Sequence, residues 1–387
     1  MAKVPRRQQK QLSRKQLSRR EKERHQRQML IVGAAVLLGA ILLILGFGLY
    51  DRYVRWPRTP VATVSGVPIQ LDTYQKLLRY RQWDYRNYLN RLENQRAQAS
   101  AGGEEQAFLV QYIEQQIRRT QSDISNLPMM VLDEMIDDQL VRQECKKRGI
   151  TVTSEETQLG IEEQFGYDRN PPTPAPITVT LPITVTATPT TAPMTHEQFQ
   201  TQSASWFEAV RTATGFNKSD YQTLMESSLY HKALEEAIGA EAPTTAEQIH
   251  ARHILVETRE EAEDVLARLS AGEDFVELAA EVSTDTSNKD QGGDLGWFPR
   301  GRMVPAFDEA AFSLSPGQTS DIVETQFGFH IIQVEERDPA RELSEADLQS
   351  ARREIVNDWF KERRASEEVV RSWDSSMIPK ATPTKPY

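Results

Sequence analysis

Residues 250–256 read HARHILV, a run whose apolar members are aliphatic and which ends at the polar residues Glu257 and Thr258. Such a run predicts a buried strand. Side chains alternate along a strand, so His250 and His253, three positions apart, point to opposite faces and do not converge on one metal ion. We therefore expect no metal site here, with His253 directed inward and His250 at an edge or in solvent.

The sequence after this strand predicts a compact α+β module. Thr258 and Glu261 match a capping box, and apolar residues at helical spacing follow as far as Gly272. A second helix, a polar loop that contains several glycines, a short third helix and two strands complete the pattern. The expected order is β-α-α-α-β-β within residues 246–338, with the elements at 249–257, 258–272, 274–283, 304–314, 321–325 and 328–336.

Three segments of this module resemble the parvulin family of peptidyl-prolyl cis/trans isomerases in their order and spacing. They are HARHILV at 250–256, GGDLGWFPRGRMVPAFDEAAFSL at 292–314 and TQFGFHIIQVEE at 325–336. The resemblance covers about residues 248–337 and implies a parvulin fold with a slot for a proline ring above a polar floor. By resemblance, the slot is formed by Leu295, Met303, Phe307 and Phe329, and the catalytic floor by His253, Asp285, Thr325 and His330.

The chemistry of X-Pro isomerisation fits these residue types. Rotation about the bond faces a barrier of ~18–20 kcal/mol because amide resonance must be broken, yet no covalent bond changes. An enzyme for this step therefore needs no nucleophile, metal or cofactor, and we expect none. We expect the two histidines, backed by an aspartate and a threonine, to orient and polarise the amide.

The loop after the first strand bears on substrate choice. Phosphate-dependent parvulins place basic residues there, whereas this chain reads VETREEAED, in which four glutamates surround the single Arg259. We expect a phosphorylated substrate to be repelled and ordinary unfolded X-Pro segments to be bound. The four glutamates are Glu257, Glu260, Glu261 and Glu263.

The first fifty residues predict a membrane anchor. Residues 1–28 contain eleven Lys/Arg against two Glu, and residues 29–50 are 22 consecutive uncharged residues. At ~1.5 Å per residue, that run spans a hydrocarbon core of ~30 Å. The run is longer than the apolar core of a cleaved signal peptide, which is the alternative reading. The positive-inside rule places the basic arm in the cytoplasm and the rest of the chain outside the cell membrane.

The rest of the chain reads as mainly helical. Residues 57–243 are expected to form a helical domain, interrupted by a Pro/Thr-rich insertion at 170–194, and residues 343–373 a C-terminal helix before a disordered tail at 374–387. VATVSGVPI at 61–69 and IDDQLVRQECKKRGITVTSEE at 136–156 resemble the chaperone segments of PrsA/SurA-like foldases. The parvulin-like module would then be inserted between helical chaperone segments.

Two functions are compatible with these features. The first is a single-pass membrane foldase that binds unfolded or nascent secreted chains and isomerises their X-Pro bonds. The second is a membrane-tethered holdase whose parvulin module is weakly active or inactive. We expect membrane lipid as a partner through residues 29–50 and no nucleic acid, and we leave homodimerisation open. A serine protease is disfavoured because no serine lies in a GxSxG elbow.

Overall fold

The computed structural model describes residues 14–102, 106–170 and 193–379. These residues divide into two compact units. Unit 1 takes in the described residues of Met1–Gln143, Val152–Ser227 and Ser366–Tyr387, and unit 2 comprises Glu144–Thr151 and Ser228–Ala365. The predicted insertion at 170–194 lies almost wholly outside the described residues.

Unit 1 combines a small antiparallel sheet with long helices. Strands β1 (Pro60–Val64) and β2 (Val67–Gln70) form a hairpin whose turn contains Ser65 and Gly66. The helical part contains α2 (Leu71–Ser100), most of α3 (Ala107–Arg148), α4 (Ser154–Gln164), α5 (His196–Thr214) and the start of α6 (Lys218–Gly239). Aromatic side chains from several of these helices pack together, with Tyr80 stacked on Phe216 at 4.5 Å.

The C-terminal segment corrects two expectations. Helix α10 (Glu345–Ala365) ends before residue 373, because the β-branched residues that follow form β7 (Val369–Arg371) and pair with β1. Residues 374–379 are also not a disordered tail. Ser375–Met377 form a short 3-10 helix in which Met377 is buried, and the Gln75 side chain donates a hydrogen bond to the Met377 carbonyl. Residues 380–387 lie outside the described residues.

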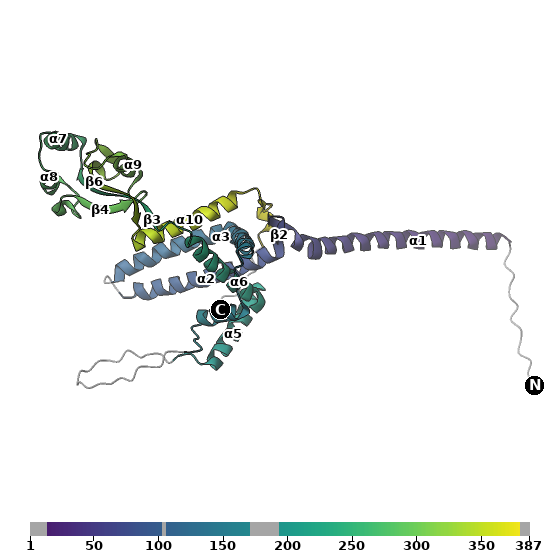
Figure 1. Ribbon diagram of the computed structural model, residues 1–387. Helices are drawn as coiled ribbons and strands as arrows, with labels where there is room; N and C mark the ends of the chain where they lie inside the picture. The colour runs from purple at the N-terminus through teal and green to yellow at the C-terminus, as the bar shows by residue number, and fades with distance from the viewer. Residues whose placement is uncertain (1–13, 103–105, 171–192, 380–387) are drawn as a thin grey trace, which may run out of the picture. The chain divides into compact units, whose positions relative to one another are not determined.

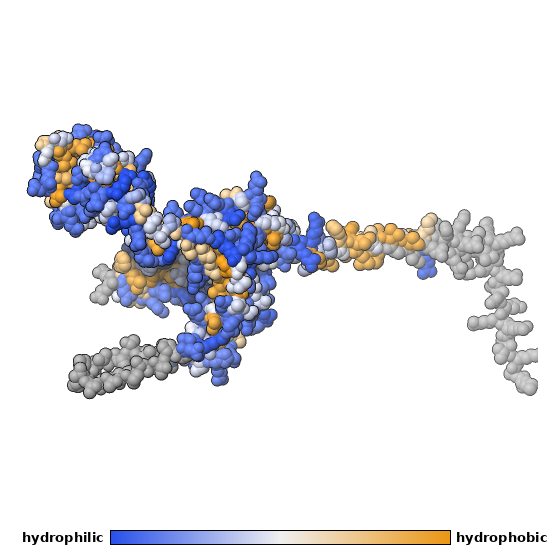
Figure 2. All heavy atoms as spheres, viewed as in Figure 1, coloured by the Kyte–Doolittle hydropathy of each residue, from blue (hydrophilic) through white to orange (hydrophobic). Residues whose placement is uncertain are grey.

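Helix α1 (Arg14–Tyr50) is long, with a charged first part and an uncharged, apolar part from residue 29, and it continues into short π and 3-10 turns at Asp51–Arg55 and Trp56–Arg58. Within the described residues, the segment Val36–Arg58 is apolar and long enough to cross a membrane, and none of it is buried in the protein. Figure 2 shows this exposed hydrophobic band along the helix. An apolar helix at this place fits either a membrane anchor or a signal sequence.

Unit 2 is built on a four-stranded antiparallel sheet with strand order β4-β3-β6-β5 (Figure 1). The central strands β3 (Thr245–Val256) and β6 (Gly328–Glu342) pair along almost their whole length. The edges are β4 (Asp294–Pro299) and β5 (Val323–Thr325). Three helices complete the module, namely α7 (Arg259–Ser270), α8 (Phe275–Val282) and α9 (Pro305–Ser313).

Strand alternation gives the sheet two separate cores. On one face, Ile249, Ala251 and Ile332 pack with Phe307 and Phe312 of α9. On the other face, residues that include Ile254, Val256 and Ile331 pack with apolar residues of α7 and α8. Each ~100 Å² of apolar surface buried in this way is worth about 2.5 kcal/mol, so both faces hold the strands in one register.

Strand β4 corrects the predicted order of elements. The segment DLGWFP was interpreted as part of a polar loop, but it pairs with β3 over Gln248–Arg252, so the order is β-α-α-β-α-β-β. Its glycines and proline conceal the strand in the sequence, while a partner more than forty residues away provides the hydrogen bonds. The capping box predicted at Thr258 and Glu261 is present at the start of α7.

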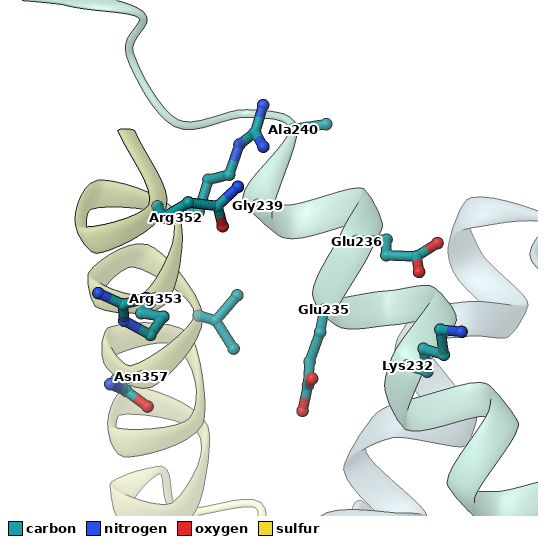
Figure 3. Close-up of a pocket in the computed structure, with 10 residues that line it drawn as sticks. Lys232, Glu235, Glu236, Gly239, Ala240, Arg352, Arg353 and Asn357 are labelled. Carbon is teal, nitrogen blue, oxygen red and sulfur yellow. The ribbon is translucent and has the colours of Figure 1, made fainter. Parts of the chain in front are cut away.

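The second half of α6 and helix α10 also belong to unit 2. A pocket of about 600 Å³ lies between them, lined on α6 by residues that include Glu235 and Glu236 and on α10 by Arg352, Arg353 and Val356 (Figure 3). Gly239 lies opposite the Arg352 stem, and a Cβ at this glycine would meet the Arg352 side chain at 3.5 Å, an ordinary contact distance. The pocket lining therefore contains both acidic and basic side chains.

Candidate functional site

The four residues predicted for the catalytic floor form one hydrogen-bonded chain. His253 lies on β3 and His330 on β6, and their Nδ1 atoms are 3.1 Å apart. The Thr325 hydroxyl lies 2.8 Å from His330 Nε2, and the Asp285 carboxylate lies 2.9 Å from His253 Nε2. The two imidazoles stack with ring centroids 5.4 Å apart, and both side chains are buried. The sheet thus brings together residues 77 positions apart.

The direction of the hydrogen bonds follows from the carboxylate. An ionised aspartate only accepts, so His253 donates from Nε2 and its Nδ1 must accept. His330 then donates from Nδ1, and its Nε2 accepts from the Thr325 hydroxyl. Each ring carries one proton and is neutral, and all four ring nitrogens have partners.

The pKa shifts agree with two neutral rings. Burial lowers the pKa of His253, although Asp285 and Asn288 oppose this effect. Burial, reinforced by repulsion from His253, lowers the pKa of His330 from 6.5 to about 4. The pKa of Asp285 is also lowered, because hydrogen bonds from Ser287 and His253 outweigh its partial burial. The site therefore holds one anion beside two uncharged imidazoles near neutral pH.

The loop after α8 positions Asp285. The hydroxyl and backbone N–H of Ser287 donate to Asp285 Oδ1 at 2.6 and 3.0 Å, and the Asn288 amide donates to Oδ2 at 3.0 Å. Asn288 is buried, its amide nitrogen also lies 3.1 Å from His253 Nε2, and its Oδ1 has no hydrogen-bond partner. Sequence reasoning missed Ser287 and Asn288. The signal was present, since serine two residues and asparagine three residues after an aspartate favour such local turns.

Phe307 forms the apolar wall above the histidines. Its ring meets His253 at 5.7 Å and His330 at 5.3 Å, edge to face in both cases. Leu295 and Met303 are half-buried and pack against the core cluster to which Phe307 belongs. Three of the four predicted slot residues are therefore on the same face of the sheet as the histidines.

Phe329 is not part of this slot. It precedes His330 on β6, so alternation directs it to the opposite face, where it packs with Ile254, Val256 and the helices α7 and α8. The Arg259 guanidinium lies over its ring at 5.3 Å. The prediction that Phe329 contributes to the slot was wrong.

His250 lies on the other face from His253, as the alternation argument predicts. Its Nε2 lies 2.8 Å from Asp294 Oδ1 and its Nδ1 lies 3.3 Å from Glu335 Oε2. The ligand atoms of these three residues are close enough to hold a metal ion by spacing alone. However, the Arg252 guanidinium pairs with Glu335, and His250 has a carboxylate at each ring nitrogen. The three residues thus already lie close to one another, and Arg252 pairs with one of the two carboxylates.

Comparison with known proteins matches both parts of the chain. Residues 239–338 match the PPIC-type PPIase domain family, and residues 21–172 match the SurA-like N-terminal domain family. The second match begins within α1 and ends before the helices α5 and α6, so it covers only part of the predicted domain at 57–243.

Individual relatives agree with these two matches. The chain is 37% identical over 205 residues to the foldase protein PrsA of Caldanaerobacter subterraneus, covering 53% of this chain and 56% of that protein. It is 47% identical over 126 residues to the foldase protein PrsA of Halalkalibacterium halodurans, covering 32% of this chain and 35% of that protein. A crystal structure of PrsA from Bacillus anthracis is 24% identical, with 61% of this chain and 90% of that chain covered and a TM-score of 0.29.

The matched regions thus span about a third to a little over half of the length of these two curated relatives. Both family matches agree with the resemblances seen in the sequence, and the parvulin match falls on the module that contains the histidine pair. The chain thus carries a match to the PPIC-type PPIase domain at residues 239–338 and to the SurA-like N-terminal domain at residues 21–172, and foldase proteins PrsA are among its homologues.

Proposed function

We propose that this protein is a membrane-anchored, extracytoplasmic peptidyl-prolyl cis/trans isomerase and chaperone that assists the folding of secreted proteins. The observation that carries the proposal is the hydrogen-bonded chain from Thr325 through His330 and His253 to Asp285, with Phe307 packed edge-on against both imidazoles. An apolar wall over a fixed polar floor suits a proline ring attached to a polar amide.

In the proposed mechanism the site stabilises the twisted amide and transfers no proton. All four imidazole nitrogens are occupied within the network, so none is free to accept a proton from the substrate. Leu295, Met303 and Phe307 hold the proline ring, while the amide rotates against the rigid floor. Interactions that are stronger for the twisted than for either planar form lower the barrier, and each ~1.4 kcal/mol gives a factor of ten in rate.

We propose that the substrates are unphosphorylated X-Pro segments of unfolded chains. The four glutamates of the loop and the first half of α7 are all exposed. Arg259, the basic residue among them, already pairs with Glu324 at 3.0 Å. A phosphate in this region would therefore meet net negative charge without a free guanidinium to bind it.

We also propose that α1 remains as the membrane anchor, with the basic arm in the cytoplasm and both units outside. The exposed apolar segment Val36–Arg58 and the excess of eleven Lys/Arg over two Glu in residues 1–28 support this orientation. Homodimerisation stays open in this proposal.

A protease-coupled isomerisation assay tests the proposed activity. With the full chain in detergent micelles and an unphosphorylated X-Pro peptide, we expect acceleration of cis-to-trans conversion. His253→Gln should lower kcat/KM by about tenfold or more, the equivalent of ~1.4 kcal/mol in transition-state stabilisation. His250→Gln is the matched control, because it removes a histidine from the same strand but from the opposite face, and it should retain most of the activity.

Two outcomes would contradict the enzyme proposal. If the wild-type chain gives no acceleration but suppresses aggregation of an unfolded client, the module serves a holdase. If His250→Gln and His253→Gln reduce activity equally, the histidine pair is only a structural element of the sheet. A clear preference for a phospho-Ser-Pro peptide over its unphosphorylated form would overturn the proposed substrate class.

A further inference from the structure

A second pocket adjoins the proline slot at the end of the sheet where β3 begins. It has a volume of about 910 Å³ and is lined by side chains from β3, β4, β6 and the start of α10. Leu295 and Met303 line this pocket and also pack against the cluster that contains Phe307. The Trp297 ring, by contrast, stacks on His250, on the face of the sheet opposite the histidine pair, so the pocket is lined from both faces of β4 and is linked to the slot through Leu295 and Met303.

The pocket presents a positively charged group that the protein itself does not neutralise. The guanidinium of Arg341 lies over the Trp297 ring at 4.2 Å, and Arg341 is exposed. Among the described residues it forms no ion pair. Arg302, the other arginine of the pocket, is already paired with Asp347 at 3.3 Å.

The backbone that carries Arg341 is fixed from inside the protein. Gln248 is 3% exposed, and its amide donates to the carbonyls of Arg341 and Glu342 at 3.3 and 3.0 Å. A buried amide bound to two consecutive carbonyls restrains the strand beneath the guanidinium. The Arg341 guanidinium is therefore stacked on Trp297, and the main chain of Arg341 is fixed by the Gln248 amide.

Most of the acidic groups of the pocket are engaged locally. Asp338 accepts a hydrogen bond from the Ala340 backbone N–H, and Asp347 pairs with Arg302 and accepts from the Ser344 hydroxyl. Glu342 is the remaining carboxylate among the described residues that line the pocket. It is the group that would favour a basic client residue instead.

The opposite end of β3 has the opposite charge. The strand runs from Thr245 to Val256 and is followed by the glutamates around α7, whereas Gln248 and Arg341 lie at its beginning. His253 lies between these two ends. The acidic region and Arg341 thus lie toward opposite ends of β3.

From this arrangement we infer that the pocket around Arg341 and Trp297 is a specificity subsite that binds an acidic side chain of the client flanking the proline. This inference rests on the proposed isomerase function. The Arg341 guanidinium would pair with the client carboxylate, while Trp297, stacked on His250, supports the guanidinium.

The test compares two sets of three X-Pro peptides, in which Glu, Gln or Lys occupies a position before the proline in one set and after it in the other. For the full chain in detergent we expect kcat/KM to be about threefold higher for Glu than for Gln at one flank, the size that a partly exposed ion pair gives. Arg341→Gln should bring the ratio to about one, and Arg341→Lys should keep part of it. Glu342→Gln is the matched control and should leave or increase the preference for Glu.

Other results would overturn the inference. If kcat/KM is equal for the Glu and Gln peptides on both sides of the proline, the pocket is not a subsite for acidic residues. If the Lys peptide is preferred and Glu342→Gln abolishes that preference, the pocket binds basic residues instead. If no peptide is accelerated, the proposed isomerase function fails, and fluorescence polarisation of the same peptides then tests the subsite alone. The subsite is supported by tighter binding of the Glu peptide that Arg341→Gln abolishes, and equal dissociation constants refute it.

Discussion

At the scale of single residues, His330 illustrates how burial sets the chemistry of the site. An ordinary histidine titrates close to neutral pH, but His330 is buried and faces His253, so its pKa falls from 6.5 to about 4. Its neutral form leaves Nε2 able to accept from Thr325 while Nδ1 donates to His253. The floor of the slot thus stays uncharged except for Asp285 through the neutral pH range.

This shift predicts a pH dependence of stability. Because the pKa of His330 is lower in the folded protein, the unfolded chain takes up its proton first as the pH falls. The stability that the neutral His330 contributes is fully present above pH 6.5 and is lost as the pH falls from 6.5 to about 4. The loss in the free energy of unfolding is at most about 3 kcal/mol. Hydrogen exchange of peptides from β3 and β6, measured by mass spectrometry, should show local protection falling across this range.

The variant His330→Gln provides the control for this measurement. It should be less stable near neutral pH and should lose less additional protection on acidification than the wild-type chain. The pKa of Asp285 is also lowered, so the folded protein loses stability when this carboxylate is protonated at low pH. This effect is the same in both proteins, because both contain Asp285. Identical pH profiles for the two chains would contradict the assignment of the shift to His330.

At the scale of elements, the approach of β4 to β3 depends on one glycine. Gly293 has φ of +74°, and a Cβ there would lie 2.0 Å from the carbonyl oxygen of His253. The Gly293 carbonyl in turn accepts a hydrogen bond of 2.9 Å from the His253 backbone N–H. The backbone of β3 is thus held against Gly293 at His253.

We predict that Gly293→Ala destabilises unit 2 strongly, by about 3 kcal/mol or more, because both the backbone conformation and the close contact are violated. Gly296→Ala is the matched control. That glycine also has positive φ, of +65°, but nothing lies within 4 Å of the added Cβ, so the cost should be about 1 kcal/mol. Urea unfolding of both variants measures the difference, and equal losses would show that the contact with His253 is not limiting.

The terminal elements of unit 1 are tied together through one strand. β7 pairs with β1, and Trp373 beyond it donates a hydrogen bond of 2.9 Å to the Tyr74 hydroxyl of α2. That hydroxyl donates in turn to the Pro128 carbonyl, and burial raises the pKa of Tyr74 to about 12. The chain that follows α10 therefore completes a domain begun more than three hundred residues earlier.

At the scale of the whole molecule, the distribution of charge and hydrophobicity defines the predicted topology. The basic arm, the exposed apolar helix and the acidic remainder follow one another along the chain, which carries a net charge of −10. We predict that the full chain, produced in bacteria with a tag at its C-terminus, sediments with membranes and resists extraction by alkaline carbonate. Deletion of residues 1–50 should release it in soluble form.

The same tagged chain tests orientation and retention. Protease added to the outside of protoplasts or spheroplasts should remove the C-terminal tag, while a cytoplasmic control protein stays intact. Protection of the tag would contradict the proposed orientation. A mature protein that lacks the N-terminal residues by mass spectrometry would show that the helix is a cleaved signal sequence.

The sequence alone determined the features that depend on local patterns. Alternation separated His250 from His253, the capping box set the start of α7, and the run at 29–50 indicated an apolar helix long enough for a membrane. The resemblance also identified the four floor residues, which the structure joins by hydrogen bonds. Each of these inferences rests on spacing within a few residues or on motifs read in order.

Only the tertiary structure decided the features that depend on distant partners. The segment DLGWFP is a strand because β3 supplies its hydrogen bonds, and residues 369–371 leave the predicted helix because β1 pairs with them. Phe329 was assigned to the wrong face, although its neighbour His330 was placed correctly. Asn288 and Arg341 matter through groups more than thirty residues away, and no local pattern specifies such contacts. Long-range pairing and side-chain direction are thus fixed by packing of the whole sheet, which is where the site acquires its shape.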